Sequence, residues 1–106
     1  MAKFLFTGTF TASGIAGVRK AGGTSRTKAI AKLAESVGGS LESYHFAFGS
    51  DDFFVIVDLP DNAAAAATAL AVAESGAANL RTIVLLTPKE VDAAVKLRPT
   101  YKAPGA

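Results

Sequence analysis

The stretch Phe46-Ala-Phe-Gly-Ser-Asp-Asp-Phe-Phe-Val-Ile-Val-Asp-Leu-Pro-Asp61 decides the fold. An apolar strand over residues 52–59 lies at its centre, and the aromatic strand before it, residues 40–48, leads into the turn Gly49-Ser50-Asp51. Because so short a link leaves no room for a crossover, we expect these two strands to pair as an antiparallel hairpin. A Pro-Asp pair then begins an alanine-rich helix over residues 63–73.

The remaining elements lie on either side of this stretch. Residues 3–10 are aromatic and β-branched and predict a strand, and the helical region after them is broken by Gly22-Gly23. Another strand is expected over residues 80–87, and a short last helix begins at Pro88 and ends near Leu97. The order β-α-β-β-α-β predicts an α+β fold of the ferredoxin-like type, a four-stranded antiparallel sheet with helices on one face. Right-handed crossovers place the first and third strands at its centre.

The length and composition limit what the chain can be. Its 106 residues suit one domain, expected over residues 1–97, with a flexible tail over residues 98–106 that contains two prolines. A net charge of only +2 argues against nucleic-acid and membrane partners. With no cysteine and one histidine, we expect no disulfide, no metal site and no cofactor. No apolar stretch is long enough for a signal peptide or a membrane span, so a cytoplasmic location is expected.

Both faces of the expected sheet are apolar, which is the most informative feature of the sequence. In the first strand Phe4 and Phe6 alternate with Leu5, and in the third strand valines alternate with Phe54 and Ile56. Two helices can cover only one face, and an exposed apolar face promotes association. We therefore expect the uncovered face to meet a second copy of the chain, giving a homodimer or a higher oligomer.

The opening stretch resembles the signature of the GYD-domain family, an aromatic strand, Gly-x-Tyr-Asp, an apolar strand and Pro-Asp before a helix. The resemblance spans roughly residues 3–95, and the tyrosine of the signature is Asp51 here. It implies a dimeric α/β-barrel association of ferredoxin-like domains, and no established activity. Further matches to the family pattern are Thr11-x-x-Gly14, Gly22-Gly23 with Arg26, Gly38-Gly39, Ser75-Gly76 and Arg81-Thr82.

His45 is the candidate acid-base residue, because no other side chain ordinarily titrates near neutral pH. Strict alternation places it on the face of Leu41, and Tyr44 on the opposite face together with Glu42. Fold relatives of the family include cofactor-independent monooxygenases and isomerases, where His45 would act with Asp52 or Tyr44 in support. The alternatives are a packed, structural His45 and an Asp52 that stabilises the turn.

The candidate ligand-binding residues are Tyr44, Phe6, Phe54, Arg26 and Arg81. With them we expect an apolar cavity between sheet and helices that binds a small apolar or aromatic molecule. A self-association module without catalysis or a pocket remains open as an alternative.

Two polar features of the sequence have structural interpretations. Asp58 lies within a central strand and is expected to pair with Arg26 or Arg81, since an unpaired buried carboxylate is costly. The segment from Gly22 to Arg26 can present backbone N–H groups to an anion. It lacks the ending of a phosphate-binding loop, so a helix break capped by Thr24 or Ser25 is the favoured interpretation.

Overall fold

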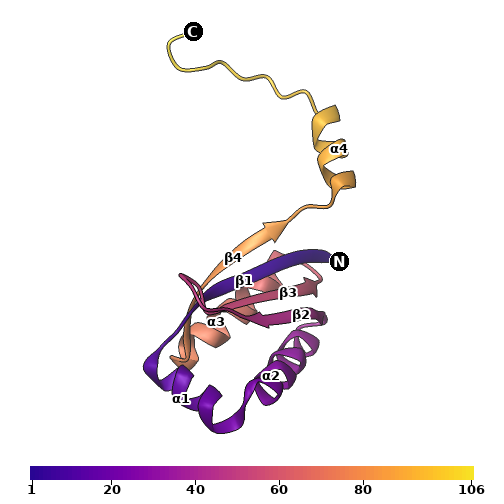
Figure 1. Ribbon diagram of the computed structural model, residues 1–106. Coiled ribbons are helices and arrows are strands. Elements are labelled where there is room, and N and C mark those ends of the chain that lie inside the picture. The colour runs from indigo at the N-terminus through magenta and orange to yellow at the C-terminus, as the bar shows by residue number, and fades with distance from the viewer.

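The structure, a computed structural model, describes residues 1–106 as a four-stranded sheet with four helices (Figure 1). The first helical region is two helices, α1 and α2, and the predicted order of the other elements is confirmed. The second strand ends two residues earlier than expected, and the fourth begins and ends two residues earlier. The elements are β1 (Ala2–Phe10), α1 (Ala12–Ala21), α2 (Gly23–Ser36), β2 (Ser40–Phe46), β3 (Phe53–Leu59), α3 (Asn62–Ser75), β4 (Ala78–Leu85) and α4 (Pro88–Lys96).

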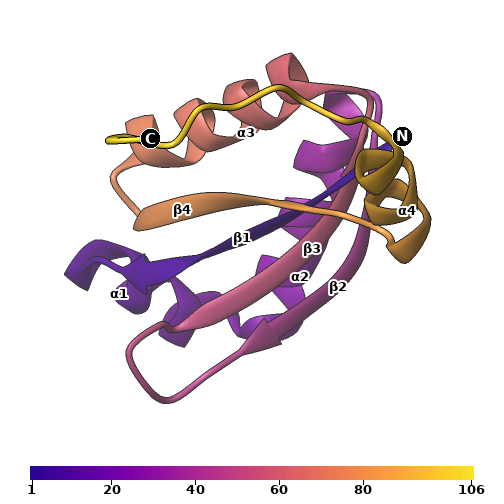
Figure 2. The ribbon, with the colours of Figure 1, turned by 90° about the horizontal axis from the view of Figure 1, so that it is seen from above.

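The sheet is antiparallel throughout and has the strand order β2-β3-β1-β4. The first and third strands therefore occupy the centre, as the sequence predicts. Helices α2 and α3 pack on the same face, as the view along the sheet shows (Figure 2). The core lies between this covered face and the helices, and consists of Phe4, Phe6, Ala34, Phe53, Val55, Val57, Leu59, Ala65 and Ala78.

A β-bulge in β2 overturns the strict alternation expected there. The register with β3 shifts between Leu41 and Ser43, so Leu41 and Tyr44 both lie against the core. Glu42 is displaced to the other side of the sheet, where its carboxylate pairs with Lys3. The prediction that Glu42 lies on the same face as Tyr44 is therefore wrong. The extra residue of the bulge moves every residue before it to the opposite face of the strand.

Lys3, and neither Arg26 nor Arg81, is the partner of Asp58. Its Nζ lies 3.1 Å from Asp58 Oδ1, because Lys3 and Asp58 are direct neighbours across the β1–β3 pairing. The hydrogen bonds that the Lys3 ammonium donates to Glu42 and Asp58 raise the pKa of Lys3. The three side chains form a partly exposed charged cluster at one end of the uncovered face of the sheet, which we call the open face.

The break between α1 and α2 is caused by Gly22. Its φ of 87° lies in the region that favours glycine, and the residue is both the C-cap of α1 and the N-cap of α2. No side chain caps α2, so the expected cap at Thr24 or Ser25 is wrong, since both residues are already inside the helix. The other long helix, α3, has an ordinary cap in which Asp61 accepts a hydrogen bond from the Ala64 N–H at 2.9 Å.

The chain after β4 leaves the folded body altogether (Figure 1). A capping box between Thr87 and Glu90, with Pro88 at the first turn, begins α4. Every residue from 86 to 106 is exposed, and we refer to this segment as the arm. The radius of gyration of 16.7 Å exceeds the roughly 13 Å expected for a compact domain of this length.

Two glycines of α1 allow a matched test of helix docking. A Cβ on Gly14 would collide with the carbonyl oxygen of Ala77, whereas a Cβ on Gly17 would meet open space. Gly14→Ala should therefore lower the free energy of unfolding by about 1–3 kcal/mol, as overpacked sites do. Gly17→Ala should raise it by roughly 0.4–1 kcal/mol, because alanine has less backbone freedom to lose. Urea unfolding of both variants measures this, and equal effects would contradict the close approach of α1 to Ala77.

Candidate functional site

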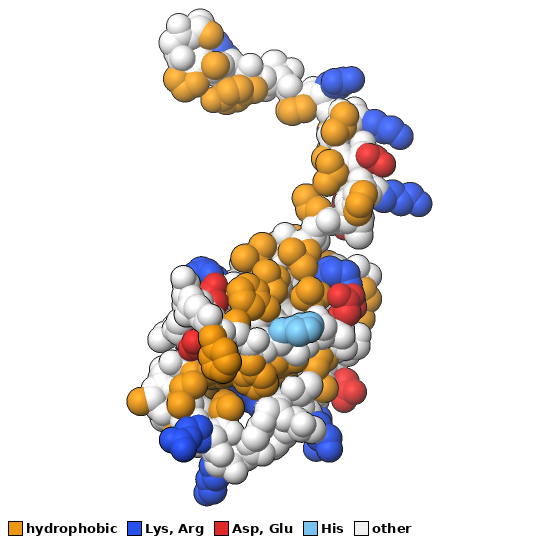
Figure 3. Space-filling view, viewed as in Figure 1, with side chains coloured by type: hydrophobic (Ala, Val, Ile, Leu, Met, Phe, Trp, Pro, Cys, Tyr) orange, Lys and Arg blue, Asp and Glu red, His pale blue; other side chains and the backbone are white.

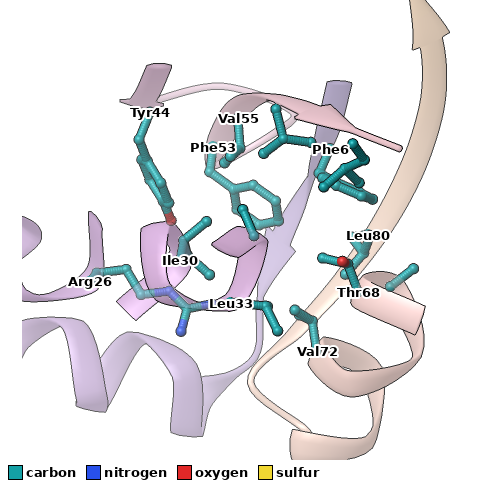
Figure 4. A pocket seen from close by; sticks show the side chains of 14 residues that line it. Phe6, Arg26, Ile30, Leu33, Tyr44, Phe53, Val55, Thr68, Val72 and Leu80 are labelled. Atoms are coloured by element: carbon teal, nitrogen blue, oxygen red, sulfur yellow. The ribbon is translucent and has the colours of Figure 1, made fainter. Parts of the chain in front are cut away.

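A narrow apolar cavity lies between the covered face of the sheet and the helices (Figure 4). Its volume of about 30 Å³ is room for about two water molecules. Twelve of its 14 lining residues are hydrophobic, so the cavity offers a bound molecule few polar contacts. The side chains that surround it include Phe6, Phe53 and Val55 from the sheet, Ile30 and Leu33 from α2, and Val72 from α3.

Two polar side chains, Arg26 of α2 and Tyr44 of β2, lie at one end of this cavity (Figure 4). The Nε atom of Arg26 is buried and has no hydrogen-bond partner, and no carboxylate of the chain forms an ion pair with its guanidinium. The guanidinium carbon lies 5.9 Å from the centre of the Phe10 ring, within the range of a cation–π contact. Arg26 is therefore a half-buried cation without a counter-ion.

Burial raises the pKa of the Tyr44 hydroxyl, and the nearby guanidinium of Arg26 opposes this rise only in part. The phenol consequently keeps its proton at neutral pH and is able to donate a hydrogen bond. Tyr44 is fixed in place by the aromatic ring of Phe46, whose centre lies 4.8 Å away.

A second, wider hollow adjoins the cavity. This groove lies between α1 and α2 and has a volume of about 270 Å³. Small residues such as Gly17 and Ser25 line it, together with Phe10. Arg26 lines both the groove and the cavity, so its side chain forms the boundary between them. The groove also contains Gly22, at the uncapped start of α2.

The structure brings only some of the expected ligand-binding residues together. Phe6, Tyr44 and Arg26 all line the cavity. Phe54 and Arg81 do not line it, because they point to the open face of the sheet. Arg81 is occupied there by Asp51, with Nη2 2.7 Å from the carboxylate oxygen Oδ2.

The two candidate catalytic residues have separate surroundings. His45 is exposed and lies next to Phe54 across the β2–β3 pairing, on the open face. Asp52 Oδ2 accepts a hydrogen bond from the Phe10 N–H at 2.9 Å, and the backbone N–H of Asp52 donates to the Gly8 carbonyl at 2.7 Å. These bonds hold the turn against β1, and no hydrogen bond joins Asp52 to His45.

Sequence reasoning missed the part of the site contributed by α3. Thr68, Ala69 and Val72 line the cavity at the spacing of one helix face. The residues of α3 itself are apolar on nearly every side of the helix, so its sequence has no periodicity that distinguishes the face toward the cavity. In α2 the signal was present, because Arg26, Ile30 and Leu33 recur at helical spacing.

The open face of the sheet has a different character. Figure 3 shows hydrophobic side chains gathered around the single histidine on this side of the body. The apolar residues of the open face are Leu5, Phe54, Ile56, Ile83 and Leu85.

Neither a metal site nor a membrane-spanning helix is found. No group of three or more metal-ligating side chains lies close enough together to hold a metal ion. No helix has the length and apolar character needed to cross a membrane.

These features define an α+β domain with one helix-covered sheet face, a small apolar cavity beneath the helices and an uncovered apolar face. The model of the GYD domain matches residues 4–95, from β1 into α4. The chain therefore belongs to the GYD-domain family, which confirms the resemblance in the sequence. No curated protein and no solved structure matches it.

The pKa of Tyr44 predicts how stability depends on alkaline pH. Its raised pKa in the folded state means that folding becomes less favourable as pH rises above about 10, where the unfolded phenol ionises and the buried one does not. The melting temperature of Tyr44→Phe should therefore fall less between pH 9 and pH 11 than that of the unaltered protein. Tyr101→Phe, at an exposed position, is the control. Parallel pH profiles for Tyr44→Phe and the unaltered protein would contradict the burial of this hydroxyl.

Proposed function

We propose that this GYD-domain protein binds a small, mainly apolar or aromatic molecule between its sheet and its helices. The observation that carries the proposal is the apolar cavity, which has Arg26 and Tyr44 at one end and meets the wider groove at Arg26. Small-molecule sites in proteins combine an apolar lining with a few polar groups that fix orientation. The cavity and the adjoining groove together approach the lower end of the usual volume range, about 300–1,000 Å³.

The arrangement around the cavity favours binding over catalysis by His45. A monooxygenase or isomerase that used this residue would need the imidazole within hydrogen-bond reach of the bound molecule. His45 belongs to the opposite side of the sheet from the cavity. The strand itself separates the two, so binding in the cavity does not depend on the histidine.

A second proposed function, self-association, has support from the open face. Phe54 and Ile83 are exposed by 41% and 42% on this face, beside the partly buried Leu5 and Ile56. Such a contiguous apolar patch is typical of interaction sites, and a two-fold axis would bring the same patch of two copies together. We therefore propose a homodimer in which the open faces of two sheets cover each other.

The arm adds to the surface available for this association. Val91 and Val95 of α4 lie one helical turn apart, and Val95 and Leu97 are exposed by 63% and 70%. A helix of nine residues is only marginally stable in water without a surface to pack on. A second copy would supply such a surface next to the sheet interface, and stable interfaces typically bury about 800 Å² per partner.

Filling the cavity should weaken binding. Ala69 lines the cavity, and Ala66 lies on the exposed side of the same helix. The unaltered protein should bind one molecule of an anilinonaphthalene sulfonate dye per chain, in a saturable fluorescence titration. Ala69→Leu should weaken this binding at least tenfold, because the added side chain takes up the space. Ala66→Leu should leave it within twofold. Equal binding by both variants would place the dye elsewhere and contradict the cavity as the site.

Neighbouring residues of β4 test the proposed dimer. Ile83 faces the open side, whereas Val84 pairs with Phe4 on the other face and is 55% exposed. Ile83→Glu should convert the dimer to a monomer in sedimentation velocity, since it places a charge in an apolar contact. Val84→Glu, with the same change in charge, should remain dimeric. A monomeric unaltered protein at 100 μM would overturn the proposal.

A further inference from the structure

We infer that the molecule bound between the sheet and the helices is a carboxylic acid with an apolar body, and that Arg26 binds its carboxylate. The inference rests on the proposed binding function and adds the chemical class of the ligand. It depends on the unpaired state of Arg26, on the position of this residue between cavity and groove, and on the donors around it.

The charge of Arg26 lacks a partner where comparable cations have one. Lys3, which is partly buried like Arg26, and Arg81, which is exposed, both pair with carboxylates of the chain. Arg26 has no such pair, and its buried Nε donates to nothing. An unsatisfied buried donor is unfavourable for folding, and the penalty is greater for a charged group. An anionic ligand removes this penalty when it binds.

The Arg26 Nε atom, which has no hydrogen-bond partner, indicates the shape of the anion. A carboxylate binds arginine through two parallel hydrogen bonds, and the pairing along the side of the guanidinium uses Nε together with one terminal nitrogen. The Phe10 ring, 5.9 Å from the guanidinium carbon, supports the planar group from one side. Nε has no partner within the chain, so a small rotation of the half-buried Arg26 side chain would let it serve as one half of a two-point contact with a planar anion.

The surroundings of Arg26 suit one negative charge attached to an apolar body. Tyr44 keeps its hydroxyl protonated, so it can donate a further hydrogen bond to a carboxylate oxygen. The first turn of α2 has no side-chain cap, and its N–H groups add partial positive charge at the groove. Beyond Arg26 the cavity is lined by side chains such as Leu33 and Val72, which suit hydrocarbon.

A phosphate group fits this site less well. It has more oxygens and more charge than one guanidinium satisfies, and the cavity offers hardly any other polar lining. The carboxylate would lie at the boundary formed by Arg26, with most of its apolar body in the groove of about 270 Å³ and only an edge of it in the cavity of about 30 Å³. A flat aromatic acid is a suitable probe for such a space.

Calorimetric titration with 2-naphthoate and its neutral isostere 2-naphthamide tests the inference. The unaltered protein should bind the acid at least tenfold more tightly than the amide. Arg26→Met should remove this difference by weakening the acid and leaving the amide within threefold. Arg19→Met, which makes the same charge change at an exposed site outside both hollows, should preserve it. Inorganic phosphate should not compete with the acid at equimolar concentration.

Each deviation from these results has a distinct meaning. Equal binding of acid and amide by the unaltered protein, with both lost in Ala69→Leu, would overturn the carboxylate inference and leave the binding function intact. No binding of either probe at millimolar concentration would overturn both. An equal loss of acid affinity in Arg19→Met and Arg26→Met would show that net charge, and not the site, attracts the acid.

The melting temperature of the ligand-free protein provides a second readout. Arg26→Met should melt at a higher temperature than the unaltered protein, because methionine removes the unsatisfied charged donor and keeps most of the apolar stem. A purely structural arginine would show the opposite sign. A lower melting temperature in Arg26→Met would therefore contradict the inference even before any ligand is added.

Discussion

The pairing of β1 with β3 is the constraint on which the rest of the structure depends. It places Phe4 beside Val57 and Phe6 beside Val55, and these four side chains form the centre of the core. Helices α2 and α3 cover this surface. The same pairing directs Leu5 and Ile56 to the other face, because successive residues of a strand alternate. Apolar residues on both faces of the central strands thus produce one covered core and one uncovered patch.

The fold could be predicted to this depth because its signals are local or topological. The short turn after β2 requires a hairpin, the Gly22-Gly23 pair divides the first helical region, and the right-handed crossover rule orders the strands. The start of a helix also depends on local chemistry where a side chain can accept a hydrogen bond from the first turn, as Asp61 does for α3. Each of these features depends on residues close together in the chain or on a general rule of topology.

The parts that sequence reasoning missed depend on register and on distant contacts. A single bulge near Glu42 moved that residue to the open face and brought Leu41 into the core, and no local pattern indicates where a bulge occurs. The partner of Asp58 was missed for a similar reason, since Lys3 is next to Asp58 only in the folded sheet. Arg26 was named as a candidate from the sequence, but its lack of a counter-ion could be seen only with all carboxylates in place.

The two proposed surfaces use alternate residues of the same strand, which makes them chemically independent. In β3, Phe53 and Val55 face the cavity, whereas Phe54 and Ile56 face the open side. The proposed ligand would therefore contact one set of side chains, and a second copy of the chain would contact the other. The binding of an acid at Arg26 and the association of two sheets can thus each be removed by a substitution that leaves the other surface unaltered.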